Sequence, residues 1–145
     1  MEVCMRDISK IIVHCSATPE NREVSIDEIK RWHVEERGFS DIGYHWVIEL
    51  DGSIRKGRHE AQAGAHAKGH NSGSVGVCYI GGCDSDMNPK DTRTDKQKES
   101  LHCLLIDLLG RYPDAEIIGH RDVSSKACPS FDAKAEYSGL EPDQV

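Results

Sequence analysis

Several segments of the chain carry β-branched or apolar runs in the pattern of β-strands. One further segment predicts a β-hairpin, because an Asp-Gly pair, a typical two-residue turn, separates its two strand-like halves. The predicted strands are ISKIIVH at residues 8–14, the hairpin YHWVIELDGSIRKG at residues 44–57, SVGVCYIGG at residues 74–82 and AEIIGH at residues 115–120.

Two segments have apolar residues at helical spacing and begin with a capping signal. A serine and a glutamate three positions apart predict a helix over residues 25–36, which a glycine ends. A threonine and a glutamine likewise begin a predicted helix over residues ~94–110, where four leucines form one apolar face. Residues 59–73 (HEAQAGAHAKGHNSG) are too rich in glycine and polar residues for a regular element and predict a long functional loop.

Strands that alternate irregularly with helices favour a mixed α/β fold. The length of 145 residues fits one domain, so we expect a central mixed β-sheet flanked by α-helices. The domain is expected to span residues 1–137, with a flexible tail at residues 138–145.

The charge and composition exclude some classes of partner. The formal net charge of -7 argues against nucleic acid or an anionic membrane as the main partner. No apolar stretch approaches the ~18 residues of a membrane span, and the N-terminus shows no signal peptide. We therefore expect synthesis in the cytoplasm, where the six cysteines would stay reduced.

Two histidines and one cysteine are candidates for a metal site. His14 and His120 each follow an apolar strand, and Cys128 lies in a loop eight positions further on. Two imidazole nitrogens and one thiolate suit zinc, and three protein ligands would leave a fourth position open, as in catalytic sites. Spacing alone also fits isolated histidines and a buried thiol, because other histidines are equally available.

Four motifs that occur in the same order in a known family favour the metal site over isolated histidines and a buried thiol. VHCSAT, DIGYHWVIELDGSIRKGR, AGAHAKGHNSGSVGVCYIGG and GHRDV…KACPSFD resemble the zinc-dependent N-acetylmuramoyl-L-alanine amidases, above all the short amidase-type lysozymes of bacteriophages. Animal peptidoglycan recognition proteins are related to the same family. The resemblance runs in order from about residue 8 to residue 135 and so covers nearly the whole chain.

The resemblance implies an enzyme that hydrolyses the amide between N-acetylmuramic acid and L-alanine in peptidoglycan. It implies one zinc ion per chain, bound by the two histidines and the cysteine named above. Tyr44 and Lys126 match positions that the family uses in hydrolysis. His66 and Lys68 match a loop that lines the cleft, where they would contact substrate.

Other residues in or near these motifs are expected to have structural roles and not catalytic ones. Glu60 is expected to be a solvated charge in the long loop, and Trp46 a core residue. Strand alternation sends Cys15 to the face opposite His14, so it is also expected in the core. Arg121 and Asp122 are expected to form a turn or to support His120.

Three other functions are compatible with parts of the sequence. A recognition domain would bind peptidoglycan without cutting it, although such relatives typically lack the thiol ligand, which is present here. A glycosidase needs two carboxylates that no pattern singles out. A structural zinc site would need a fourth protein ligand, such as Cys15 or His45.

Peptidoglycan is the expected partner, and the chain is expected to be a monomer that does not insert into membranes. It would act on the cell wall after release or non-classical export. Some phage relatives also bind an RNA polymerase, but the segment before the first strand is short, and we do not extend that role to this chain.

Overall fold

A five-stranded sheet forms the centre of the computed structural model, which describes residues 6–141. Its order is β4-β3-β5-β1-β7, and only β4 runs antiparallel to its neighbour. The strands are β1 (Lys10–Cys15), β3 (Trp46–Ile48), β4 (Ile54–Lys56), β5 (Ser74–Tyr79) and β7 (Glu116–Gly119). A separate pair joins β2 (Thr18–Pro19) to β6 (Gly82–Cys83).

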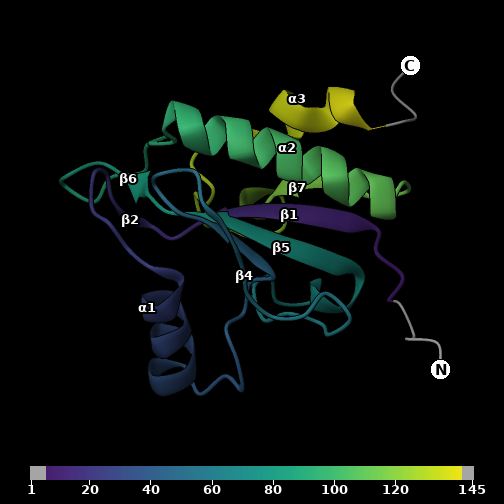
Figure 1. The fold of residues 1–145 in the computed structure, drawn as a ribbon, viewed down its shortest axis with the longest axis horizontal. Helices are drawn as coiled ribbons and strands as arrows, with labels where there is room; N and C mark the ends of the chain where they lie inside the picture. Colours follow the sequence, from purple (N-terminus) through teal and green to yellow (C-terminus); the bar gives the residue numbers. More distant parts are fainter. Residues whose placement is uncertain (1–5, 142–145) are drawn as a thin grey trace.

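Helices cover both faces of the sheet (Figure 1). The long helix α2 (Asp95–Arg111) and the short α3 (Ala133–Tyr137) lie on one side, and α1 (Ile26–Arg31) lies on the other. A π-helical turn continues α1, and three short 3-10 turns occur in the loops. These turns are η1 (Trp32–Glu36), η2 (Asn71–Gly73), η3 (His120–Asp122) and η4 (Ser138–Leu140).

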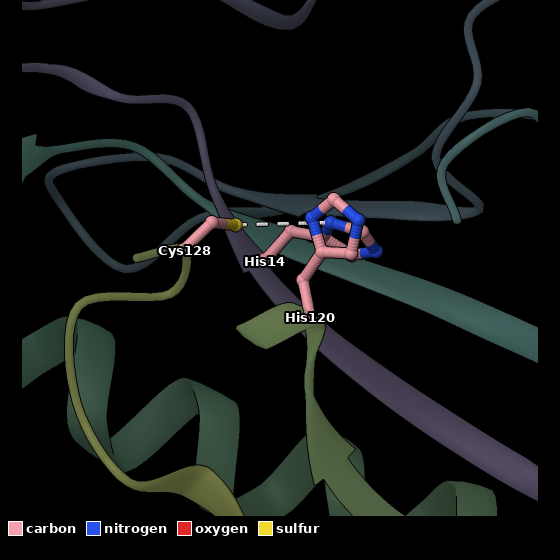
Figure 2. A group of neighbouring side chains, drawn as sticks. All are labelled: His14, His120 and Cys128. Atoms are coloured by element: carbon pink, nitrogen blue, oxygen red, sulfur yellow. Dashed lines mark hydrogen bonds between the residues drawn. The ribbon is translucent and has the colours of Figure 1, made fainter. Parts of the chain in front are cut away.

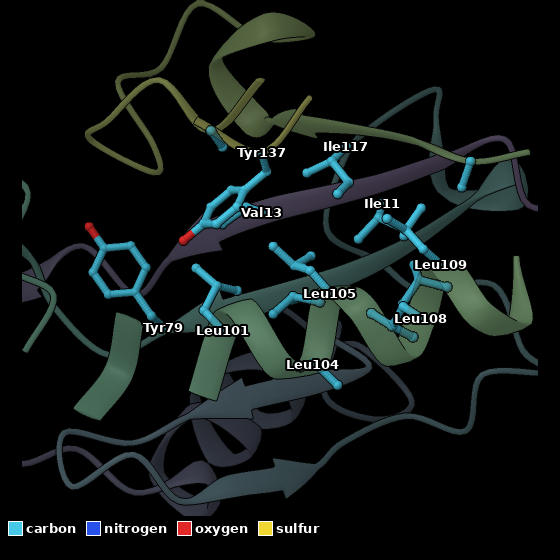
Figure 3. Close-up of a cluster of buried hydrophobic side chains, with 14 of the residues drawn as sticks. Ile11, Val13, Tyr79, Leu101, Leu104, Leu105, Leu108, Leu109, Ile117 and Tyr137 are labelled. Atoms are coloured by element: carbon cyan, nitrogen blue, oxygen red, sulfur yellow. The ribbon is translucent and has the colours of Figure 1, made fainter. Parts of the chain in front are cut away.

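Strand alternation divides β1 between two environments. Ile11 and Val13 belong to the main core, where they join the buried leucines of α2, among them Leu105 and Leu108 (Figure 3). Ile12 instead belongs to a small cluster with Ala67 of the long loop. His14 therefore leaves β1 on the face opposite the leucine-rich helix, and that face carries the candidate metal site.

The predicted mixed α/β fold is confirmed, with the predicted strands and both predicted helices. Ser25 caps α1 by accepting a hydrogen bond from the Glu28 N–H, and Thr94 and Gln97 form the full capping box of α2. The sequence did not predict the β2–β6 pair or α3. Both elements contain only a few residues, which gives no apolar period to detect.

Some expectations concern the ends of the chain and the cysteines. Residues 142–145 of the expected tail lie outside the described part, whereas residues 138–140 form η4 and Leu140 packs against the main core. Five cysteines between residues 6 and 141 are free thiols, and Cys4 lies outside this range. No helix among the described residues is long and apolar enough to cross a membrane.

Candidate metal centre

Parallel pairing of β1 with β7 brings His14 and His120 to one edge of the sheet. Val13 pairs with Gly119, so the residues that follow them, His14 and His120, lie side by side at the carboxyl ends of the two strands. The carboxyl ends of parallel strands are the usual place for ligand sites in open α/β sheets. The ring centroids of His14 and His120 are 4.5 Å apart.

A loop that is held by hydrogen bonds places Cys128 at the same edge of the sheet. The Arg121 N–H donates to the Cys128 carbonyl at 2.7 Å, and the Tyr79 hydroxyl donates to the Pro129 carbonyl at 2.7 Å. Gly119 lets this loop approach closely, because a Cβ there would lie 2.8 Å from Pro129 Cδ. The loop is therefore fixed at the thiol-bearing residue and at the proline that follows it.

His14, His120 and Cys128 form one compact group of potential ligands (Figure 2). One ligand atom from each lies within 4.8 Å of the others, and Cys128 Sγ is 3.8 Å from His14 Nδ1. The backbone N–H of Cys15 donates to Cys128 Sγ at 3.1 Å. An N–H donor of this kind stabilises a thiolate, so Cys15 contributes its backbone to the site while its side chain packs in the core.

The electrostatics of the group fit a divalent cation. Burial and the neighbouring imidazoles hold the pKa of His14 well below its usual value, and burial with Lys126 lowers the pKa of His120. Both rings are therefore neutral and able to ligate a metal. The side chain of Cys15 and burial raise the pKa of the Cys128 thiol by more than the Cys15 backbone N–H lowers it, so the thiolate needs a nearby cation.

The group opens into a cleft of about 680 Å³. Tyr44, Lys68 and Lys126 all line this cleft together with the three potential ligands. The Tyr44 ring lies beside His14, with centroids 5.1 Å apart, while both lysines are exposed. Burial, and then the neighbouring thiols, raise the pKa of Tyr44 well above its usual value.

His66 also borders the cleft, but its ring contacts His14 directly. His14 Nε2 and His66 Nδ1 are 2.8 Å apart. Burial, and then the neighbouring imidazoles and arginines, lower the pKa of His66 to about 3, so this contact joins two neutral imidazoles.

His33 also lines the cleft, although no motif or pattern in the sequence singles it out. Its Nδ1 accepts a hydrogen bond from the Gly43 N–H at 2.8 Å, and its ring lies 5.3 Å from that of Tyr44. The bond to Gly43 assigns the remaining proton of the neutral ring to Nε2. His33 thus adds a neutral N–H donor to the cleft, where it lies beside Tyr44.

Glu60 is not the solvated charge that the sequence predicted. Its carboxylate accepts hydrogen bonds from the Trp46 indole at 2.7 Å and the Tyr112 hydroxyl at 2.6 Å, and it pairs with Arg111 at 2.6 Å. These partners come from β3 and the end of α2, so the carboxylate fastens the long loop to the main body. Trp46 packs against the core as expected, but it also serves as a donor.

The two residues suggested for a fourth ligand are engaged elsewhere. His45 Nδ1 accepts from the Gly76 N–H at 3.0 Å, and its Nε2 is 2.8 Å from the Gln62 carbonyl. Cys15 Sγ is 4.0 Å from the Ser130 hydroxyl, and it does not belong to the group of ligand atoms that lie within 4.8 Å of one another. Within residues 6–141, the only group of three or more potential ligands is therefore the His-His-Cys set.

The sequence matches a known family and several of its relatives. Residues 5–131 match the profile of the N-acetylmuramoyl-L-alanine amidase family. The endolysin of Klebsiella phage KP32 is 46% identical over 129 residues, which cover 89% of this chain and 85% of that protein. Peptidoglycan-recognition protein LB of Drosophila melanogaster is 34% identical over 126 residues, covering 86% of this chain and 52% of that protein.

Solved structures have the same fold. The N-acetylmuramoyl-L-alanine amidase LysC from Clostridium intestinale URNW superposes with a TM-score of 0.80 at 27% identity, covering 97% of this chain and 88% of that one. The Drosophila recognition protein LB superposes with a TM-score of 0.76 at 28% identity, covering 94% and 83%.

The buried hydrogen bonds of Glu60 generate a pH-dependent stability prediction. Glu60→Gln removes the charge and leaves one donor facing an amide N–H, so the free energy of unfolding should fall by about 1–3 kcal/mol at pH 7. Burial raises the pKa of Glu60, but bonds from Tyr112 and Trp46 and the charge of Arg111 outweigh it and lower the pKa. Because the pKa of Glu60 is lower in the folded protein than in the unfolded chain, the ionised carboxylate stabilises the fold above the unfolded pKa of about 4.3. This stabilisation is lost as the pH falls through the folded pKa.

Urea unfolding of both proteins at several pH values measures this contribution. The difference between wild type and Glu60→Gln should be largest near neutral pH and should shrink below about pH 4. Glu99→Gln, at an exposed position of α2, should change stability by less than about 0.5 kcal/mol throughout. A Glu60→Gln protein as stable as wild type at pH 7 would show that the carboxylate does not fasten the loop.

Proposed function

The chain belongs to the N-acetylmuramoyl-L-alanine amidase family and hydrolyses the amide between N-acetylmuramic acid and L-alanine in peptidoglycan, and we propose that it does so with one zinc ion held by His14, His120 and Cys128. The observation that carries this proposal is the compact His-His-Cys group at the base of an open cleft. Two imidazoles and one thiolate form a donor set that zinc favours.

Zinc bound there would supply a Lewis acid that polarises the scissile carbonyl and activates water. Amide hydrolysis also develops negative charge on the carbonyl oxygen, which needs stabilisation by fixed donors. The exposed Lys126 ammonium lies on the cleft wall and would stabilise this oxyanion. The hydroxyl of Tyr44, whose ring lies 5.1 Å from that of His14, would orient water or donate to the same oxygen.

Substrate binding would use the cleft around this centre. Lys68 lines it from the long loop, and its exposed ammonium would contact the glycan or the peptide. Because Lys68 and Lys126 give the cleft two cations on a chain with a net charge of -7, local attraction would guide an acidic peptide there. We propose that a single chain suffices, and that it reaches the cell wall after synthesis in the cytoplasm.

A binding-only recognition domain is the alternative function. Cys128 supplies the thiol that such relatives typically lack, and three protein ligands beside the cleft would leave a fourth metal position open, which supports an enzyme. A domain that only bound peptidoglycan would have no use for an open position.

The products and the metal requirement test the proposal together. Purified cell walls treated with the protein should gain free amino ends on alanine without new reducing sugar ends. Elemental analysis should find about one zinc per chain, and a strong chelator should stop the reaction until zinc is restored. New reducing ends would instead identify a glycosidase, and full activity of metal-free protein would refute the zinc mechanism.

Lys126 and Lys68 should differ in the step that they affect. Lys126→Ala should keep its zinc and its KM but lower kcat by about 10²–10³-fold, because the oxyanion exists only in the transition state. Lys68→Ala should raise KM with little change in kcat, because a substrate contact acts before the chemical step.

Steady-state kinetics on a soluble muramyl-peptide amide, with zinc content measured for each variant, separates the two roles. The Lys68→Ala protein is the matched control, because it removes the same charge from the same cleft. A nearly normal kcat of the zinc-loaded Lys126→Ala protein would refute this role of Lys126. The metal and Tyr44 would then be the groups that stabilise the oxyanion.

A further inference from the structure

Four polar groups form a continuous chain of hydrogen bonds behind the candidate metal site. His14 Nε2 is 2.8 Å from His66 Nδ1, and His66 Nε2 is 3.3 Å from the Ser74 hydroxyl. The Ser74 hydroxyl is in turn 2.7 Å from the backbone carbonyl of His70. None of the mechanistic roles above uses this series of hydrogen bonds, although it begins at His14, a proposed metal ligand.

The last link fixes the direction of every bond. A carbonyl only accepts, so the single proton of the Ser74 hydroxyl goes to His70 O. Ser74 Oγ can then only accept from His66, which places the His66 proton on Nε2. A neutral imidazole has one proton, so His66 Nδ1 accepts, and His14 must donate through Nε2.

This direction leaves Nδ1 of His14 without a proton. Nδ1 is also the nitrogen that faces Cys128, with Nδ1 and Sγ 3.8 Å apart. Because a metal binds the unprotonated nitrogen, the hydrogen bond at the far nitrogen selects the one that faces the site. It also fixes the plane of the His14 ring and increases its basicity as a ligand.

The His66 ring packs closely against two glycines. A Cβ on Gly76 of β5 would lie 2.7–2.8 Å from three atoms of the ring, and a Cβ on Gly64 would lie 2.7 Å from its Cδ2. The Asn71 side chain accepts from the backbone N–H groups of His66 and Ala67, each at 2.9 Å. Both the ring and its backbone are therefore held in place.

We propose that His66 is a positioning residue for the metal site, which with Ser74 holds His14 in the tautomer and orientation that present Nδ1 to zinc. The inference rests on the proposed zinc site. Both ring nitrogens of His66 are occupied by these bonds, so we assign it this role in preference to a contact with substrate.

Two amides of different length provide a matched test. His66→Asn places an amide oxygen close to the position of Nδ1, where it can accept from His14. His66→Gln carries the same amide one methylene further, toward Ser74, and leaves His14 without its acceptor. His66→Phe fills the space without any polar atom.

Zinc affinity, measured by competition with a chromophoric chelator, is the first readout and needs no substrate. His66→Gln and His66→Phe should bind zinc about 10–100-fold more weakly than wild type, the usual loss when such a partner is removed. His66→Asn should stay within about threefold of wild type. Gly76→Ala keeps His66 but displaces its ring, so it should weaken zinc binding in the same way.

The second readout is the proton on His14 Nε2, observed by nuclear magnetic resonance of the zinc-loaded protein. It should exchange slowly with water in wild type and His66→Asn, and rapidly in His66→Gln. A purely structural role would lower the melting temperature of the metal-free variants without separating the Asn and Gln proteins in either readout.

The possible failures are distinguishable. If wild type binds no zinc, the proposed function itself is wrong. If wild type binds zinc but the Asn and Gln variants bind it equally well, the positioning role is refuted. Unchanged zinc affinity together with a raised KM in all three His66 variants would return His66 to the substrate-binding residues.

Discussion

The parallel pairing of β1 with β7 is the constraint on which the site depends. Because Val13 and Gly119 are partners, two histidines that lie 106 positions apart in the sequence emerge at the same level of one sheet edge. The alternation of β1 then assigns Ile11 and Val13 to the leucines of α2 and His14 to the cleft. A shift of one residue would turn the imidazole toward the leucines of α2 and place an apolar side chain at the site, so core packing itself fixes the position of His14.

Loops complete the site, and buried polar contacts hold those loops in place. Tyr79 and Arg121 fix the segment that carries Cys128, while Glu60 fastens the start of the long loop. Arg6 donates to the backbone carbonyls of Glu60, Asn71 and Ser74 and so joins the two ends of that loop. A metal centre needs ligands held to within a fraction of an ångström, and these contacts supply that rigidity.

The sequence predicted the fold and the three residues that the structure groups at the cleft better than the supporting contacts. Apolar periods and caps identify strands and helices, and the resemblance in four ordered motifs selected His14, His120 and Cys128. The role of Glu60 was mispredicted, because its partners Trp46 and Tyr112 are distant in sequence and no local pattern joins them. Gly76 was a usable signal, since a glycine inside an apolar strand often marks a close approach, here by His66.

The central claim is that the two histidines and the cysteine hold one zinc ion through a defined set of atoms. X-ray absorption at the zinc edge tests this most directly, because it reports the elements and distances around the metal. The account predicts one sulfur at about 2.3 Å and two imidazole nitrogens at about 2.0–2.1 Å, with the sulfur lost in a Cys128→Ser protein. A zinc shell without sulfur in the wild-type protein, or one with two sulfurs, would contradict it.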